Sequence, residues 1–139
     1  VPIGALLIKK GSSETFVPGD HASTFGGNPL ATYAGVVALT AILEEGMLKN
    51  CEEVGAYFLS RLEKSKDKFP FVKEVRGRGL ILGMELKIEG GDIVKEMLQK
   101  GILINCTMGN VLRFLPPLIV TKKEVDRVVE ALEEVFNKI

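Results

Sequence analysis

The 139-residue chain has 18 basic and 18 acidic residues, a hydrophobic content of 46% and two cysteines. This length suits one domain with a real core, and the balanced charge gives no electrostatic basis for binding nucleic acid or an anionic membrane. Cys51 and Cys106 lie far apart and form no C-x-x-C motif, which argues against a disulfide framework and favours a reducing, cytoplasmic setting.

The chain begins with the apolar run VPIGALLI, which predicts a buried strand. This run includes no initiator methionine and no signal-like segment, so we expect the sequence to come from within a longer protein. A polar segment rich in Gly, Pro and Ser follows, KKGSSETFVPGD, and it predicts a surface loop.

The next stretch, HASTFGGNPLATYAGVVAL, predicts a helix start that also suits an anion. Asn28 is a preferred N-cap residue, and Pro29 suits the first helical position. The N–H groups of a first helical turn lack internal acceptors and lie at the positive end of the helix dipole, and the hydroxyls of Ser23 and Thr24 add donors. Two interpretations stay open: phosphate binding, and helix capping alone, which is the commoner use of such residues.

The predicted helix from Pro29 to about Glu45 is apolar around most of its circumference. Its longest apolar stretch, Leu30 to Leu43, is shorter than the ~20 residues of a membrane helix, so we expect a buried helix. Small residues recur along one stripe at three- to four-residue spacing. This stripe predicts close packing, either within the domain or against a missing domain or a partner subunit.

A capping box at Asn50–Glu53 predicts the start of a second helix. Alternating apolar residues from Phe71 to Leu86 then predict an antiparallel strand with one face on a core. The glycines on either side of Arg78 indicate a bulge or a close backbone approach. Arg76 and Arg78 are expected to be exposed charges rather than ligand contacts.

The C-terminal part predicts four more elements. Asp92 can cap a short helix, and Gly101 suits the end of that helix. A hairpin then joins strands over 102–105 and 111–115, and a capping box at 121–124 begins a closing amphipathic helix. Elements in this order indicate an α+β fold, with an antiparallel or mixed sheet of about three to four strands covered by helices in two layers.

Arg113 is a charged residue inside the predicted strand VLRFLPPL. It shares a face with Val111 and Leu115, so if that face is inward the guanidinium needs an anion. Its planar fork suits a carboxylate, which it can bind through two parallel hydrogen bonds. The alternatives are a salt bridge to an internal acid such as Glu85, or an edge strand that leaves Arg113 in solvent.

Three segments together, HASTFGGNPLATYAGVVAL, EVRGRGLILGMEL and GNVLRFLPPL, resemble the C-terminal part of class III, fold type I pyridoxal-phosphate aminotransferases. The resemblance covers nearly all of the chain and is closest to the acetylornithine aminotransferases. It implies that residues 1–28 form the last strand and the cofactor-phosphate loop of a large domain. Residues 29–50 would then form a long interdomain helix, and residues 51–139 the small C-terminal domain.

The resemblance also implies the site residues. In the family, the position of Thr24, with Ser23 close by, contacts the phosphate of pyridoxal 5'-phosphate across a dimer interface. The arginine that matches Arg113 holds the α-carboxylate of the amino-acid substrate. No lysine of this chain matches the Schiff-base lysine, which is expected upstream of Val1, and no metal site is implied.

The implied reaction moves the δ-amino group of N-acetylornithine to 2-oxoglutarate, a step of arginine biosynthesis. Its partners would be these small molecules, the N-terminal part of the same enzyme, and a second identical subunit in a homodimer with shared active sites. Ornithine, succinylornithine and 4-aminobutyrate aminotransferases share much of this region and remain alternatives. A further alternative is that the isolated chain is a non-catalytic module for dimerisation and cofactor contact.

Overall fold

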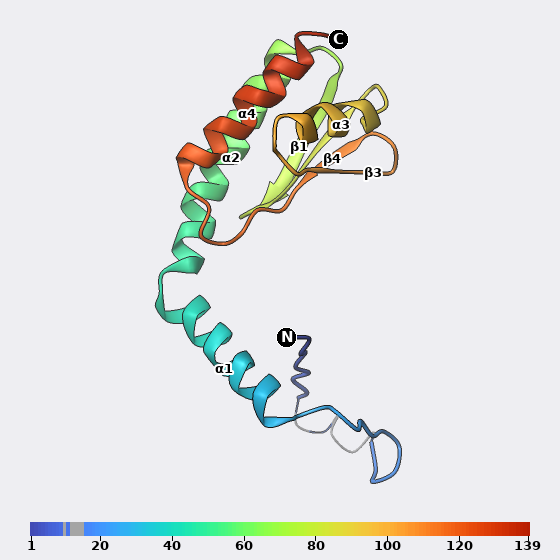
Figure 1. Ribbon diagram of the computed structural model, residues 1–139, viewed down its shortest axis with the longest axis vertical. Coiled ribbons are helices and arrows are strands. Elements are labelled where there is room, and N and C mark those ends of the chain that lie inside the picture. Colours follow the sequence, from blue (N-terminus) through green and yellow to red (C-terminus); the bar gives the residue numbers. More distant parts are fainter. Residues whose placement is uncertain (10, 12–15) are drawn as a thin grey trace. The chain divides into compact units, whose positions relative to one another are not determined.

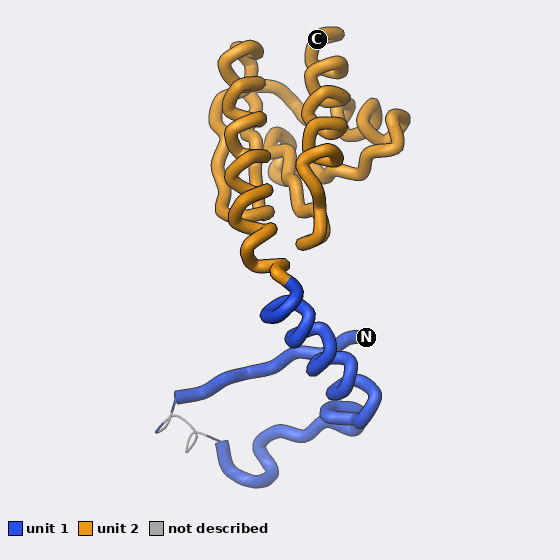
Figure 2. Tube along the Cα trace, turned by 90° about the vertical axis from the view of Figure 1, so that its left-hand side faces the viewer, with its two compact units in different colours: residues 1–45 blue, residues 46–139 orange. Residues whose placement is uncertain are grey.

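A computed structural model describes residues 1–9, 11 and 16–139 of the chain. The chain divides into two compact units, Val1–Glu45 and Gly46–Ile139 (Figure 2). In chain order, the elements are α1 (Pro29–Glu44), α2 (Met47–Lys68), β1 (Val72–Arg78), β2 (Ile81–Leu86), α3 (Gly91–Gln99), β3 (Asn105–Thr107), β4 (Val111–Phe114) and α4 (Lys122–Phe136) (Figure 1).

The first segment of the chain is not the strand that its apolar sequence predicts. Residues 1–9 form neither helix nor strand. A strand is held by the N–H and C=O groups of a neighbour, and the sheet of the described residues contains only β1 to β4. The predicted loop that follows is irregular and exposed where it is described, while residues 10 and 12–15 lie outside the described residues.

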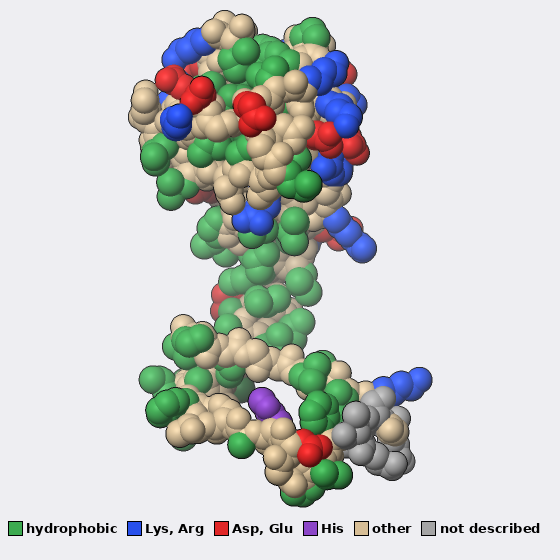
Figure 3. Space-filling view, turned by 90° about the vertical axis from the view of Figure 1, so that its right-hand side faces the viewer, with side chains coloured by type: hydrophobic (Ala, Val, Ile, Leu, Met, Phe, Trp, Pro, Cys, Tyr) green, Lys and Arg blue, Asp and Glu red, His purple; other side chains and the backbone are tan. Residues whose placement is uncertain are grey.

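Helix α1 has the expected position but not the expected burial. Its only buried residue is Ala31, whereas Leu30 and Leu39 are 74% and 58% exposed. Hydrophobic side chains cover its visible surface in Figure 3. Close packing occurs at Gly35, where an added Cβ would lie 3.1 Å from Cδ1 of Ile3. The prediction of a buried helix is therefore wrong within this chain, which supplies too few partners for so apolar a surface.

None of the described helices is long and apolar enough to cross a membrane as a single helix. Helices α1 and α2 meet the length and composition requirement only when they are taken together, across the break between them.

The second unit is a two-layer α+β domain, which confirms the predicted fold class. Its four strands form an antiparallel sheet in the order β1-β2-β4-β3. Helices α2 and α4 lie side by side against this sheet (Figure 1), and α3 contacts α4 and β3. The sheet contributes its inward side chains to the core: Val72, Val75, Leu82, Met84, Leu86, Leu112 and Phe114.

Helix α2 begins three residues before the predicted capping box. Its N-cap is Gly46, which has a left-handed φ of 76° that suits glycine. Asn50 is inside the first turn, and its Nδ2 donates to the carbonyl oxygens of Leu118 and Val120 at 2.7 and 3.0 Å. The predicted cap at Asn50 is wrong because this side chain binds a distant segment instead of its own helix.

The segment expected to form one strand is a hairpin that turns at residues 79–80. The predicted close backbone approach is confirmed at this turn, because a Cβ added to Gly55 of α2 would lie 2.3 Å from the carbonyl oxygen of Gly79. The register irregularity lies elsewhere, between Val72 and Glu74. Because Gly55 and Gly79 have no side chains, the backbone of α2 packs directly against the backbone of the hairpin turn.

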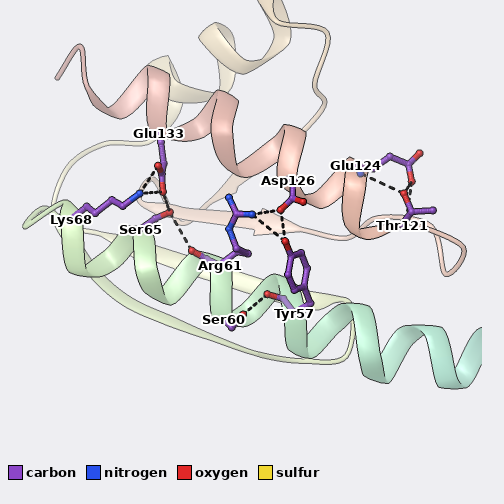
Figure 4. A network of polar contacts seen from close by, with 9 residues as sticks. All are labelled: Tyr57, Ser60, Arg61, Ser65, Lys68, Thr121, Glu124, Asp126 and Glu133. Carbon is purple, nitrogen blue, oxygen red and sulfur yellow. Dashed lines mark hydrogen bonds and ion pairs between the residues drawn. The ribbon is translucent and has the colours of Figure 1, made fainter.

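A polar network joins α2 to α4 (Figure 4). The hydroxyl of Tyr57 donates to Oδ1 of Asp126 at 2.6 Å, and Nη1 of Arg61 donates to the same oxygen. The ammonium of Lys122 lies 5.2 Å from the centre of the Tyr57 ring, within the range of a cation–π contact. These contacts fix the two helices against each other at the edge of the core.

A second cluster of the same network surrounds Ser65, which is fully buried. Its Oγ donates to Oε1 of Glu133 at 2.7 Å, and Nζ of Lys68 lies 2.8 Å from Oε2 of Glu133. Burial acts to raise the pKa of Glu133, but the hydrogen bonds from Lys68 and Ser65 outweigh it and leave the pKa lowered. The buried hydroxyl therefore has a charged acceptor.

Three local predictions in the C-terminal part are confirmed. Gly101 follows α3 with a φ of 73°, and the predicted hairpin forms with its turn at Met108 and Gly109, whose φ angles are 54° and 81°. The bounds predicted for its first strand, 102–105, are wrong, because the residues that pair with β4 are Asn105–Thr107. The predicted cap at Asp92 is also wrong, because α3 begins at Gly91 with Gly90 as its N-cap.

Helix α4 has the predicted capping box: Thr121 Oγ1 accepts from the Glu124 N–H, and the Glu124 carboxylate accepts from the Thr121 N–H at 2.8 Å. The hydrogen bonds that the Glu124 carboxylate accepts from the N–H and the hydroxyl of Thr121 lower the pKa of Glu124.

Candidate functional site

The turn before α1 is built by two side chains that bind its own backbone. Oγ of Ser23 accepts from the N–H of Gly26 at 2.9 Å, and Nδ2 of Asn28 donates to the carbonyl oxygen of Phe25 at 2.8 Å. Gly27 has a φ of 71°, a conformation that favours glycine. The two glycines and two polar side chains therefore shape the turn whether or not a ligand is present.

Asn28 is also the N-cap of α1, as its sequence position predicts. Its Oδ1 accepts from the N–H of Ala31 at 3.0 Å, and Pro29 occupies the first helical position without an N–H group. These two residues reduce the number of helix N–H groups open to an anion. The helix start contributes less to a phosphate site than the residue pattern alone suggests.

The two candidate hydroxyls differ in what they contact. Ser23 is engaged within the turn, whereas the hydroxyl of Thr24 has no hydrogen-bond partner among residues 1–9, 11 and 16–139. Both side chains are exposed. Thr24 is thus the residue of this turn whose hydroxyl can donate to an external anion without breaking a hydrogen bond to any described residue.

Arg113 lies in β4, within the second unit, and points away from the core. Its neighbours Leu112 and Phe114 are 0% and 3% exposed, whereas Arg113 is exposed. In the antiparallel register it stands between Gly83 of β2 and Asn105 of β3. The face that carries Arg113 is therefore outward, although β4 is an interior strand and not the edge strand considered from the sequence.

The acidic residue considered as an alternative internal partner of Arg113 has other partners. Glu85 accepts from Nζ of Lys73 at 2.5 Å and from Nη1 of Arg76 at 2.9 Å. The hydrogen bond from Lys73, followed by that from Arg76, lowers the pKa of Glu85. Within the described part of the chain, no carboxylate lies in ion-pair distance of Arg113. Its guanidinium can therefore receive an anion from outside the chain.

The other arginines on this side of the sheet are exposed, as the sequence predicts. Arg76 is held by Glu74 and Glu85, and Arg78 is the cross-strand neighbour of Ile81. Gly83 lies between Arg76 and Arg113 in the sheet. The alternation of apolar residues along β2 does not distinguish this glycine from its neighbours. Its one sequence signal is that a glycine interrupts a segment otherwise favourable for a strand.

Each of the two candidate positions is thus a donor without an acceptor among the described residues of its unit. Thr24 offers a hydroxyl on a glycine-rich turn, and Arg113 offers a planar cation on an exposed sheet face. No group of His, Cys, Asp or Glu among the described residues is placed to hold a metal ion. Together, these donors suit anionic oxygens such as those of a phosphate and a carboxylate.

Comparison with known proteins gives consistent matches along the chain. The model of the family Aminotransferase class-III matches residues 1–136. Acetylornithine aminotransferase from Methanocaldococcus jannaschii is 50% identical over 141 residues, an alignment that covers 100% of this chain and 35% of that protein. The chain therefore spans about a third of the length of this curated relative.

Solved structures of similar proteins share the fold. The crystal structure of acetylornithine aminotransferase from Elizabethkingia anophelis superposes with a TM-score of 0.84 at 30% identity, over 91% of this chain and 33% of that one. An ornithine aminotransferase from Toxoplasma gondii, described with partial occupancy of PLP at its active site, gives a TM-score of 0.83 at 37% identity. That match covers 91% of this chain and 31% of the other.

Proposed function

Because the chain belongs to the class-III aminotransferase family, we propose that it forms part of a pyridoxal-phosphate enzyme that transfers the δ-amino group of N-acetylornithine to 2-oxoglutarate. The match of the family model to residues 1–136 confirms the class-III family that three sequence segments predicted. Within the proposed enzyme, Thr24 contacts the cofactor phosphate and Arg113 binds the substrate carboxylate. The lysine that holds the cofactor lies upstream of Val1, so the isolated chain is non-catalytic.

The residues of the turn before α1 fit a phosphate as one part of a larger site. Thr24 has an exposed hydroxyl that no described residue engages, whereas Ser23 and Asn28 keep the turn in shape through their hydrogen bonds. A single hydroxyl cannot hold a phosphate alone, so further donors come from outside the chain. We assign these donors to a second subunit of a homodimer, whose cofactor Thr24 would contact.

Bound pyridoxal phosphate supplies an electron sink for the carbon that loses its proton. The contribution of Arg113 is orientation. Its guanidinium binds the carboxylate in two parallel hydrogen bonds, which fixes both the position and the plane of that end of the substrate. N-acetylornithine and glutamate each have an α-carboxylate, so one arginine serves both half-reactions, without requiring the same pose in each.

The observation that carries the proposal is the exposed Arg113 without a carboxylate partner among the described residues. We expect Arg113→Ala in the full-length enzyme to raise KM for both N-acetylornithine and 2-oxoglutarate by about 100-fold, as loss of a charged two-bond contact requires. The melting temperature should stay unchanged because Arg113 is exposed. Steady-state kinetics and thermal unfolding measure the two quantities.

Arg127, an exposed arginine of α4, is the matched control. Arg127→Ala should leave both KM values as they are. A normal KM in the Arg113 variant would overturn the carboxylate role. Comparison of kcat/KM for N-acetylornithine with that for ornithine tests the substrate separately: a preference for ornithine would replace the proposed donor but keep the role of Arg113.

A further inference from the structure

Gly83 occupies the middle of β2, between two arginines of the neighbouring strands. In the register of the sheet it pairs with Arg76 of β1 on one side and with Arg113 of β4 on the other. Side chains alternate along β2, and its inward residues Leu82 and Met84 are buried. A side chain at position 83 would therefore stand on the exposed face, beside the arginines.

The fold itself does not require glycine at this position. Gly83 has no left-handed φ, unlike Gly77 and Gly79 in the same hairpin. An added Cβ would lie 3.6 Å from Cγ1 of Val111 and 4.0 Å from the nearest backbone oxygens, which are ordinary contacts. At Gly55, by contrast, an added Cβ would lie 2.3 Å from a carbonyl oxygen. Packing explains Gly55 but leaves Gly83 without a structural reason.

A glycine inside a strand weakens the sheet, and it often marks a place where a ligand approaches the backbone closely. The charges around Gly83 indicate the kind of ligand. Arg76 is occupied by Glu74 and Glu85, but no carboxylate of the described residues reaches Arg113. The position next to Gly83 therefore has one available cation, which suits an anionic ligand whose body lies over the glycine.

We propose that Gly83 is a specificity-determining position, whose missing side chain leaves room beside Arg113 for the carbon chain of the carboxylate substrate. The inference rests on the proposed function of Arg113. Directly opposite residues of an antiparallel pair have Cβ atoms about 4.5–5.5 Å apart, so any side chain at position 83 would stand against the stem of Arg113. Larger side chains would occupy the space that the substrate uses.

The test compares Gly83→Ala and Gly83→Val in the full-length enzyme. Glutarate, a dicarboxylate that cannot accept an amino group, serves as a binding probe in calorimetry, and KM for 2-oxoglutarate is measured alongside. We expect the Kd and KM to rise in the order Gly, Ala, Val, by at least about tenfold for Val, which is the scale of a steric change within a substrate site. The melting temperature should stay the same or rise, because a Cβ fits and valine favours strands.

Gly91 provides the matched control, because it also lacks a left-handed φ and has no atom within 4 Å of an added Cβ. It lies at the start of α3, away from the exposed sheet face. Gly91→Val should leave Kd and KM unchanged. Unchanged values in a stable Gly83→Val variant would overturn the inference. If that variant does not fold, Gly83→Ala decides, and normal glutarate binding by it would overturn the inference equally.

Arg113→Lys, measured in parallel, separates this inference from the function on which it rests. Weaker glutarate binding by Arg113→Lys together with normal binding by both Gly83 variants would reject only the role of Gly83. Normal binding by Arg113→Lys together with weaker binding by Gly83→Val would reject the two-bond carboxylate contact. The space over Gly83 would then receive another part of the substrate.

Discussion

Helices α1 and α4 have nearly the same length, 16 and 15 residues, but α1 buries one residue and α4 buries five. The difference does not come from hydrophobic content, because α1 is the more apolar of the two helices. It comes from neighbours: α4 packs on α2 and α3, whereas most apolar side chains of α1 are exposed. A hydrophobic helix is buried only where the chain supplies a complementary surface.

The largest expected effect contrasts a core leucine with an exposed one. Leu62 of α2 is 0% exposed, and Leu39 of α1 is 58% exposed. In this chain, Leu62→Ala should lower the free energy of unfolding by about 2–5 kcal/mol, because it leaves a cavity. Leu39→Ala should change it by less than about 0.5 kcal/mol. Urea denaturation followed by circular dichroism measures both values, and an equal loss in the two variants would break the contrast.

The second largest effect is expected from removing an N-cap, and each unit has one: Thr121 of α4 and Asn28 of α1. Thr121→Ala removes the cap of α4 and should lower the unfolding free energy of the second unit by about 1 kcal/mol. Asn28→Ala removes the cap of α1 and should reduce helical content without moving that unfolding midpoint. Chemical denaturation and far-ultraviolet circular dichroism distinguish the two outcomes. A shifted midpoint in the Asn28 variant would mean that α1 stabilises the second unit.

The smallest expected effect is a pH dependence of the second unit. The pKa of Glu133 in the folded state is lowered from its ordinary value of 4.5. The contribution of this carboxylate to the free energy of unfolding is therefore fully present above pH 4.5. The contribution is lost as the pH falls through the lowered pKa. Glu133→Gln should remove about 0.2–1 kcal/mol at pH 7 and flatten the loss of stability on acidification. Thermal unfolding at pH 7 and pH 3 tests this, and an unchanged acid profile would contradict it.

Features set by neighbouring residues were the most predictable from sequence. The capping box of Thr121 and Glu124 and the N-cap Asn28 depend on residues three positions apart. Asn50 fits the same local pattern, but the distant carbonyl groups of Leu118 and Val120 take its side chain instead. Local sequence could not reveal that competition, because the acceptors come from a segment nearly 70 residues later.

The same distinction holds for the candidate site. The residue types and the strand of Arg113 followed from sequence, but its outward direction depends on which of two apolar alternations faces the helices. Leu112 and Phe114 take the inward positions, and Lys73 and Arg76 occupy Glu85. For residues 1–8 the predicted strand itself is wrong, because this strand-like sequence has no strand partner among the described residues.

The first unit differs from the second in leaving most of its apolar helix exposed, and Thr24 is the most specific group that it presents for a contact beyond its own residues. Thr32 is the matched control, since its hydroxyl already donates to the carbonyl oxygens of Asn28 and Pro29 at 3.0 and 3.2 Å. The decisive measurement is the dissociation constant of pyridoxal phosphate from full-length Thr24→Ala and Thr32→Ala variants, followed by absorbance. Thr24→Ala should weaken binding by about 10- to 100-fold, the value of a hydrogen bond to a charged group, and Thr32→Ala should not. Equal affinities in the two variants would contradict the phosphate contact.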